Sequence, residues 1–260
     1  LELLRPGEIL AERERCSIVY LPVGPLEWHG PAMPYGTDAL LAQSLARRAA
    51  EKTGGVAMPT LFIGTERERP ASILCDKGFE NPEQMYVLGM DVPKNSMKSF
   101  YAREDMFAVI VREHLRLLVQ QGYRLIVIVN GHGAWGQTAT LERLAVEFSH
   151  ETPSKVIVGF PTIAREGEEI DFGHACDAET ALMQYLTDGC VDLSQLPPRD
   201  VKLKYTDWGI ADDCVFTGHP SADKCVVRDP RDATPEQGER FFRVALDHLC
   251  RQVTDAYQDL

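Results

Sequence analysis

Four short apolar runs, rich in β-branched residues, alternate along this chain with longer segments of helical periodicity. The apolar runs cover residues 17–23, 56–63, 125–129 and 156–160. Helical spacing of apolar residues marks residues 39–52, 102–121, 137–148, 179–186 and 235–257. Uninterrupted apolar runs are typical of strands that are buried on both faces. The alternation therefore predicts an α/β fold, with a mainly parallel central sheet and helices on both of its faces.

The length of the chain and its lack of a convincing linker favour one domain. A chain of 260 residues is near the upper limit of a compact α/β domain, and it contains no internal repeat. We therefore expect a single domain over residues 1–260. Residues 64–98 and 197–231 lack clean periodicity and are rich in Pro, Gly and charge. Loops of this length usually carry function or oligomer contacts.

Acidic residues outnumber basic ones, which limits the partners of this chain. The counts are 39 acidic and 27 basic residues, a net charge of −12 at pH 7. Such a protein has little electrostatic reason to bind nucleic acid or an anionic membrane. No apolar stretch approaches the roughly 18 residues of a membrane helix. We expect a small-molecule substrate, with neither nucleic acid nor membrane as a partner.

The seven cysteines are scattered and never form a CxxC pair. They fit neither a disulfide framework nor a cysteine zinc site. Charges begin at Glu2, so no signal-peptide pattern is visible, and we expect the chain to be trimmed because it lacks an initiating Met. A cytoplasmic location is expected.

The first chemical motif follows the apolar run 17–23. Glu27 and His29 are two residues apart, so in extended chain their side chains point to the same side. A loop rich in Pro and Gly then leads to Asp38, just before a predicted helix. Carboxylate and imidazole ligands suit Zn, Mn or Fe(II). The alternative is that Thr37 or Asp38 is only the N-cap of that helix.

The second motif follows the apolar run 125–129 and contains His132 between two glycines. Ligands of open α/β sheets bind at the carboxyl ends of strands, so His132 could meet the first motif there. The glycines would let the backbone approach a ligand closely. Two alternatives remain: an ordinary loop histidine, and a GxGxxG dinucleotide turn over 131–136. Against the dinucleotide turn, the next predicted strand ends in Pro161 and Thr162 and offers no acidic residue.

The third motif places His174 in a loop and Glu179 near the start of a helix. Asp177 is a plausible N-cap, and an acidic first turn is favourable by itself. Simple capping is therefore the alternative to a chemical role. A further turn, 216–223, has no chemistry that its composition can assign.

Taken together, these segments resemble the creatininase family. Residues 21–38 resemble its signature LPVGSxEQHGPHLPLxTD, and residues 129–135 resemble VNGHGGN. Residues 174–180 resemble HAGxxET, and 218–220 resemble a late GxP turn. The resemblance implies a hydrolase of the two-metal type. We expect one or two divalent cations per chain, Zn, Mn or Fe. It also implies a homo-oligomer, by analogy a hexamer.

The resemblance also implies a role for each matching side chain. Glu27, Asp38 and His132 would hold one cation. His29 and Asp38 would hold the other, so that Asp38 bridges the two. His174 would be the acid/base residue that protonates the leaving nitrogen. Glu179 would be either a further ligand or the group that orients this chemistry.

The sequence departs from the family pattern at positions expected to line the site. Ala134 stands where creatininase has a ligand glutamate, and we expect Glu179 to substitute for it. Trp28 replaces Gln, Ala32 replaces His and Cys176 replaces Gly. The expected substrate is therefore not creatinine.

We expect Trp28, Trp135 and Cys176 to line the substrate site. Trp28 and Trp135 could form an apolar wall for the substrate, or they could be ordinary packing residues. Cys176 is expected to be a spectator beside the site rather than a nucleophile.

The expected reaction is hydrolysis of a C–N bond, of a cyclic amide or a formamide-like group, by a metal-activated water. Three alternatives remain open. One is a hydrolase of the same family that opens a cyclic polyol ketone of the inosose type by C–C cleavage. The others are a dinucleotide-dependent oxidoreductase that uses the 131–136 turn, and a catalytically silent metal-binding protein.

Overall fold

The central element of the computed structural model is a sheet of four parallel strands in the order β2-β1-β3-β4. The structure describes residues 1–66, 68, 70–76, 79–84, 97–160, 174–201, 203 and 229–260. The strands are β1 (Ile18–Val23), β2 (Val56–Ala57), β3 (Leu125–Asn130) and β4 (Lys155–Gly159). Every residue of β1 and β3 is buried, which fits the uninterrupted apolar runs in the sequence.

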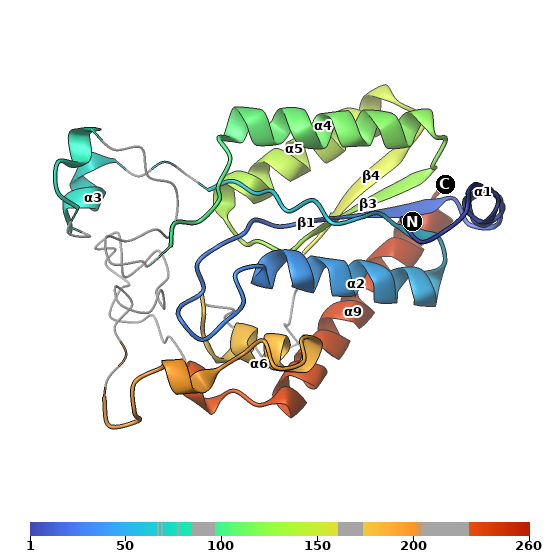
Figure 1. Cartoon of the computed structure of the whole chain (residues 1–260). Coiled ribbons are helices and arrows are strands. Elements are labelled where there is room, and N and C mark those ends of the chain that lie inside the picture. The colour runs from blue at the N-terminus through green and yellow to red at the C-terminus, as the bar shows by residue number, and fades with distance from the viewer. Residues whose placement is uncertain are drawn as a thin grey trace.

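Two helical layers cover the sheet, one on each face (Figure 1). One layer holds α4 (Glu104–Gln120) and α5 (Trp135–Glu151). The other holds α2 (Thr37–Thr53), α6 (Asp177–Leu186) and α9 (Pro235–Gln258). These layers confirm the predicted α/β fold.

Successive residues of strand β1 belong to two separate hydrophobic cores, one on each face of the sheet. Val19 and Leu21 of β1 pack with α4 and α5, whereas Ile18 and Tyr20 pack with α2, α6 and α9. This alternation follows from the two-residue period of a strand. The sheet is therefore packed against helices on both of its faces, and these contacts support its carboxyl edge.

The remaining elements lie at the two ends of the sheet. Helix α1 (Pro6–Arg15) and both chain termini lie at one end, and α3 (Ala71–Asp76) lies beyond the other (Figure 1). Three 3-10 turns complete the described elements: η1 (Pro82–Gln84), η2 (Leu193–Gln195) and η4 (Pro230–Asp232). No helix in the described part of the chain is long and apolar enough to cross a membrane.

The second apolar run forms a shorter strand than its length of eight residues predicts. Only Val56 and Ala57 pair continuously with β1, and Leu61 adds one further bridge, to Val23. Pro59 lies between them and has no N–H to donate to a ladder. The prediction of a strand over 56–63 was therefore wrong beyond its first residues.

Two predicted helix caps were also wrong. Gly36 is the N-cap of α2, so Thr37 and Asp38 lie in its first turn. Cys176 is the N-cap of α6, so Asp177 is the first helical residue rather than the cap. Both helices thus begin earlier than the sequence indicated, and each places a carboxylate in its first turn, where the helix dipole favours it.

The first and second motifs leave the sheet side by side. Val23 is in register with Asn130 at the ends of β1 and β3, and the Gly131 N–H donates to the Val23 carbonyl at 2.9 Å. The chain segments that follow these strands therefore start from neighbouring points on the carboxyl edge.

The turns at 216–223 and 218–220 lie outside the described residues, as do most of 197–231 and residues 85–96.

Candidate metal centre

Six side chains from three separate segments converge at the carboxyl edge of the sheet. Glu27, His29, Asp38 and His132 are each at most 6% exposed, and two partly buried residues from the third segment join them. The six residues are Glu27, His29, Asp38, His132, His174 and Glu179. The structure thus brings together all of the metal-binding and acid/base residues that the sequence predicted.

The first group of possible ligands consists of Glu27, Asp38 and His132. His132 Nδ1 lies 3.0 Å from Glu27 Oε2 and 3.0 Å from Asp38 Oδ2. One ligand atom from each of these residues lies within 4.8 Å of the other two. All three residues are buried, so the surrounding protein would shield a cation held by them from solvent.

The second group consists of His29, Asp38 and Glu179. His29 Nε2 lies 3.3 Å from Asp38 Oδ1 and 3.6 Å from Glu179 Oε2. Asp38 therefore presents one oxygen to each group, Oδ2 to the first and Oδ1 to the second. A carboxylate shared in this way is the arrangement of a bridging ligand in a two-metal site.

The chemistry of these atoms fits a divalent cation. Asp38 Oδ2 and His29 Nε2 are buried and make no well-aligned hydrogen bond within the described residues. Oδ2 lies 3.0 Å from His132 Nδ1, and Nε2 lies 3.3 Å from Asp38 Oδ1. Buried polar atoms without partners are costly. A set of carboxylate oxygens and imidazole nitrogens without thiolates suits Zn, Mn or Fe(II).

The charges of the site compensate one another when no cation is bound. Burial by itself would lower the pKa of His29, but the carboxylates of Asp38 and Glu179 outweigh it and raise that pKa to about 10. The pKa of His132 is raised well above its usual value in the same way, by Glu27 and Asp38 against burial. Burial would raise the pKa of Asp38, yet the two imidazoles hold it well below its usual range. Protons thus occupy positions from which a cation would displace them.

Glu179 differs from Asp38 because burial, rather than a neighbouring imidazole, sets the direction in which its pKa shifts. Burial raises the pKa of Glu179 to about 8, against the opposing effect of His29. Its Oε2, the oxygen that faces His29, accepts a hydrogen bond from the Ala175 N–H at 2.6 Å. Ala175 has a φ of 52°, which is uncommon for a residue other than glycine.

The imidazole of His174 is held in one tautomer. Its Nε2 lies 2.7 Å from the Trp28 carbonyl oxygen. A carbonyl oxygen only accepts, so Nε2 carries the proton and the neutral ring keeps its lone pair on Nδ1. Burial lowers the pKa of His174 to about 4. Nδ1 lies 3.8 Å from Glu27 Oε1, and the ring centroid is 4.5 Å from that of His29.

The loop that carries His132 is fixed by the side chain of Asn130. Asn130 Oδ1 accepts from the His132 N–H at 3.1 Å, and Asn130 Nδ2 donates to the His132 carbonyl at 2.9 Å. Gln137 of α5 donates to Asn130 Oδ1 at 2.7 Å, and its own oxygen accepts from the Thr65 N–H at 2.9 Å. This buried network sets the direction in which His132 leaves the strand.

Gly131 allows the two motifs to approach at the level of their backbones. A Cβ atom at this position would lie 2.7 Å from the carbonyl carbon of Asp38 and closer still to its oxygen. We expected the glycines of this loop to bring the backbone close to a ligand. At Gly131 the close approach is instead to the first turn of α2.

The three predicted lining residues occupy different environments. Trp28 is partly buried, and its carbonyl anchors His174. Trp135, the first residue of α5, is 78% exposed. Cys176 is 1% exposed within the core formed with α9, and burial raises the pKa of its thiol, so it lacks the properties of a nucleophile.

Tyr101 is a site residue that the sequence did not indicate. Its hydroxyl donates a hydrogen bond to Glu27 Oε1, and its ring centroid lies 5.9 Å from that of His132. It belongs to a bridge rather than to a named strand, and it comes directly after a stretch without periodicity. No local pattern marks it.

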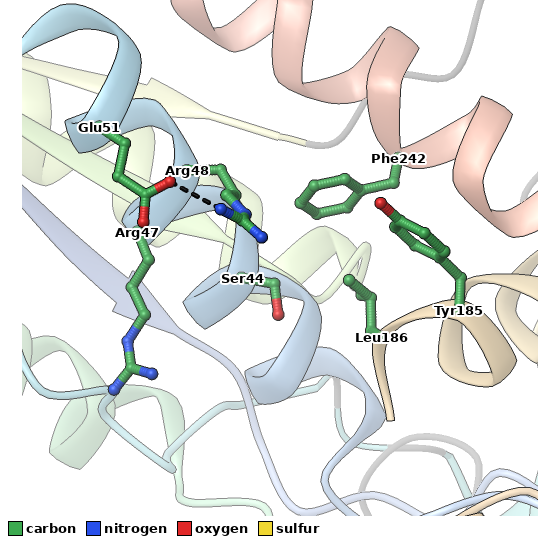
Figure 2. Close-up of a pocket in the computed structure, with 7 residues that line it drawn as sticks. All are labelled: Ser44, Arg47, Arg48, Glu51, Tyr185, Leu186 and Phe242. Atoms are coloured by element: carbon green, nitrogen blue, oxygen red, sulfur yellow. Dashed lines mark hydrogen bonds and ion pairs between the residues drawn. The ribbon is translucent and has the colours of Figure 1, made fainter. Parts of the chain in front are cut away.

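A separate pocket of about 440 Å³ lies between α2, α6 and α9 (Figure 2). Arg48 points into it and pairs with Glu51 at 2.8 Å, facing the rings of Tyr185 and Phe242. Its lining consists of Ser44, Arg47, Arg48, Glu51, Tyr185, Leu186 and Phe242. None of the six converging residues lines this pocket, so it is distinct from the candidate metal centre.

Comparison with known proteins gives a consistent set of relatives. The profile of the family described as creatininase, creatinine amidohydrolase, matches residues 3–77 and 88–253. A deformylase of Methanosphaera stadtmanae that acts on 2-amino-5-formylamino-6-ribosylaminopyrimidin-4(3H)-one 5'-monophosphate is 24% identical over 184 residues. A creatinine amidohydrolase of Pseudomonas putida is 28% identical over 115 residues.

These two sequence matches are partial on both sides. The deformylase match covers 71% of this chain and 64% of the deformylase. The creatinine amidohydrolase match covers 44% of this chain and 37% of that enzyme. The chain thus spans less than two thirds of the length of either relative.

Solved structures show the same fold over nearly the whole chain. A creatininase described as the Mn form has a TM-score of 0.67 at 21% identity, over 99% of this chain and 98% of that one. A variant creatininase of Zn-Zn type has a TM-score of 0.68 at 20% identity, over 99% and 97%. At these identities the likeness concerns the fold.

Proposed function

The chain belongs to the creatininase family, and from this premise we propose that it hydrolyses a C–N bond of a small molecule, in a cyclic amide or a formamide-like group. The observation that carries the proposal is the pair of ligand groups that share Asp38, one oxygen to each. An isolated helix cap or loop histidine would not require such an arrangement.

The proposed cation ligands follow the two groups. Glu27, Asp38 and His132 would hold one cation, and His29, Asp38 and Glu179 would hold a second. Glu179 thereby takes the place of the glutamate for which this chain has Ala134. A divalent cation bound here polarises the scissile carbonyl and lowers the pKa of the attacking water. The Mn and Zn-Zn forms among the structural relatives support Mn or Zn, and the donor set also accommodates Fe(II).

His174 is the proposed acid/base residue. Its Nε2–H is engaged by the Trp28 carbonyl, which leaves the Nδ1 lone pair on the side of Glu27 Oε1. In this orientation Nδ1 accepts the proton of the attacking water and later donates it to the leaving nitrogen. Glu179, which accepts the neighbouring Ala175 N–H, keeps its alternative role of orienting this chemistry.

Replacing His174 with alanine is expected to lower kcat by roughly 10²- to 10⁴-fold while the cation content stays unchanged, because the residue moves a proton rather than holding the cation. Metal analysis of the purified variant, beside its steady-state kinetics, makes the measurement. The exposed His150 supplies a matched control, and His150→Ala should retain full turnover. Loss of the cation together with turnover would instead make His174 a ligand, in the group that it forms with Glu27 and His29.

The substrate class is inferred from the departures at the site and from the relatives. Trp28, Ala32 and Ala134 differ from the residues of the family pattern at positions expected to line the site, which favours a substrate other than creatinine. The deformylase relative supports a formamide-like group. The dinucleotide alternative is disfavoured because His132, inside the GxGxxG turn, faces Glu27 and Asp38 instead of leaving the turn open.

An activity screen over lactams, formamides, ureides and inososes, with added Mn²⁺ or Zn²⁺, tests the proposed function. We expect one or two cations per chain and turnover of a lactam or formamide that a chelator removes and the added cation restores. A purified protein that binds neither cation would overturn the proposal. Turnover of an inosose alone would favour the C–C cleavage alternative, and cation binding without any turnover would favour the silent metal-binding protein. The homo-oligomer stays a prediction.

A further inference from the structure

We infer that Tyr101 is a positioning residue for the metal centre: its hydroxyl holds Glu27 so that Oε2 alone serves as the ligand oxygen. The inference rests on the proposed metal-dependent function, and it adds to that function a residue outside the ligand set. Neither the sequence motifs nor the family resemblance pointed to it.

The two oxygens of Glu27 have different partners. Oε1 accepts the Tyr101 hydroxyl, whereas Oε2 lies 3.0 Å from His132 Nδ1, inside the first ligand group. Glu27 is 1% exposed, so bulk water does not compete for either oxygen. The hydrogen bond therefore engages Oε1 and leaves Oε2 within the first ligand group, so Glu27 would hold a cation through Oε2.

A short antiparallel bridge places Tyr101 next to Glu27. Phe100 pairs with Leu26, and its N–H donates to the Leu26 carbonyl at 2.8 Å. Side chains alternate across such a pair, so Glu27 and Tyr101 lie on the same side of it, offset diagonally. Phe100 lies on the opposite side and is 57% exposed.

Further contacts tie the backbone around Tyr101 to the loop of the first motif. The Trp28 N–H donates to Ser99 Oγ at 3.0 Å, and the Ala102 N–H donates to the Gly64 carbonyl at 2.8 Å. Tyr101 itself bridges to Gly64. Because the residues before and after Tyr101 are both anchored, its hydroxyl has little freedom to leave Glu27.

Partners that orient ligands in this way typically change metal affinity by 10- to 100-fold when they are removed. Without the hydroxyl, Glu27 would be free to rotate, and Oε1 would lose its donor in a buried place. The rotation of Glu27 acts on the bound state of the cation, whereas the loss of the donor also lowers the stability of the cation-free fold. A tyrosine that served only for packing would affect the stability of the cation-free fold and leave the affinity unchanged.

The test is the variant Tyr101→Phe, which removes one oxygen atom and keeps the ring. The control is Tyr20→Phe, because the hydroxyl of the buried Tyr20 is also hydrogen-bonded, but its partner is Thr53, the last residue of α2. The dissociation constant for Mn²⁺ or Zn²⁺ is measured by competition with a chelator, and the unfolding midpoint is measured on the cation-free proteins. We expect a 10- to 100-fold weaker affinity for Tyr101→Phe and a change below about twofold for Tyr20→Phe.

The outcomes separate this inference from the function on which it rests. If the wild-type protein binds neither cation, the proposed function and the role of Tyr101 fall together. If the wild-type protein binds and Tyr101→Phe binds equally well, the role of Tyr101 is refuted while the proposed function stands. A lower unfolding midpoint without a change in affinity would likewise assign Tyr101 to packing alone.

Discussion

Replacing His132 with alanine is expected to abolish cation binding and turnover together. Its Nδ1 is the only nitrogen in the first ligand group, and it lies 3.0 Å from the carboxylates of both Glu27 and Asp38. Loss of a direct ligand should weaken binding by more than the 10- to 100-fold that is typical of an outer partner. Metal analysis after gel filtration, followed by kinetics with added Mn²⁺, gives the measurement.

The same substitution should destabilise the cation-free fold. Without the imidazole, the buried carboxylates of Glu27 and Asp38 face each other with no positive charge between them, which is unfavourable in a site shielded from water. His150→Ala, on the exposed side of α5, is the control and should change neither the cation content nor the unfolding midpoint. A His132→Ala protein that still turned over a substrate would place the active site elsewhere.

The sheet could be predicted from the sequence because its strands are buried on both faces. Residues 18–23 and 125–129 have no polar interruption, and each segment is followed by a turn and a helix. The length of β2 could not be predicted in the same way. Its apolar run continues past Pro59, but the continuous ladder does not, and only the bridge between Leu61 and Val23 follows, because the ladder depends on N–H donors rather than on hydrophobicity.

The metal centre could be predicted only in part from local pattern. Glu27 and His132 follow adjacent parallel strands, so their convergence is a consequence of topology. Glu179 lies in the first turn of α6 and His174 lies in the turn before that helix, and no nearby residue specifies where α6 packs against the sheet. Their place in the site was expected only from the family resemblance.

Tyr101 makes a contact that neither the local sequence pattern nor the family resemblance could predict. Its approach to Glu27 depends on one bridge between Leu26 and Phe100, made by residues that are 74 apart in the chain. A single bridge has no period that a sequence pattern can reveal. Residues that orient a ligand are therefore visible only once the backbone is in place.

Gly131→Ala is expected to damage both the fold and the metal centre, although neither glycine beside His132 has a positive φ that alanine would resist. The added Cβ would meet backbone atoms of Asp38, and backbone in the first turn of α2 cannot move aside as a side chain can. Overpacking costs about 1–3 kcal/mol, and the upper end is expected where the neighbours cannot yield. Any relief must also separate Asp38 from His132, so weaker cation binding should accompany the lower unfolding midpoint.

Gly133→Ala is the matched control, on the other side of the same histidine. Its added Cβ would lie 3.3 Å from Cζ of the Phe160 ring, a side-chain contact that a small ring movement relieves. Chemical denaturation and cation titration of both variants should therefore show a large loss for Gly131→Ala and a small one for Gly133→Ala. Equal tolerance at the two positions would contradict the backbone contact between the loop and α2. A loss of stability at Gly131 with unchanged cation affinity would show that this contact supports the fold without setting the distance between Asp38 and His132.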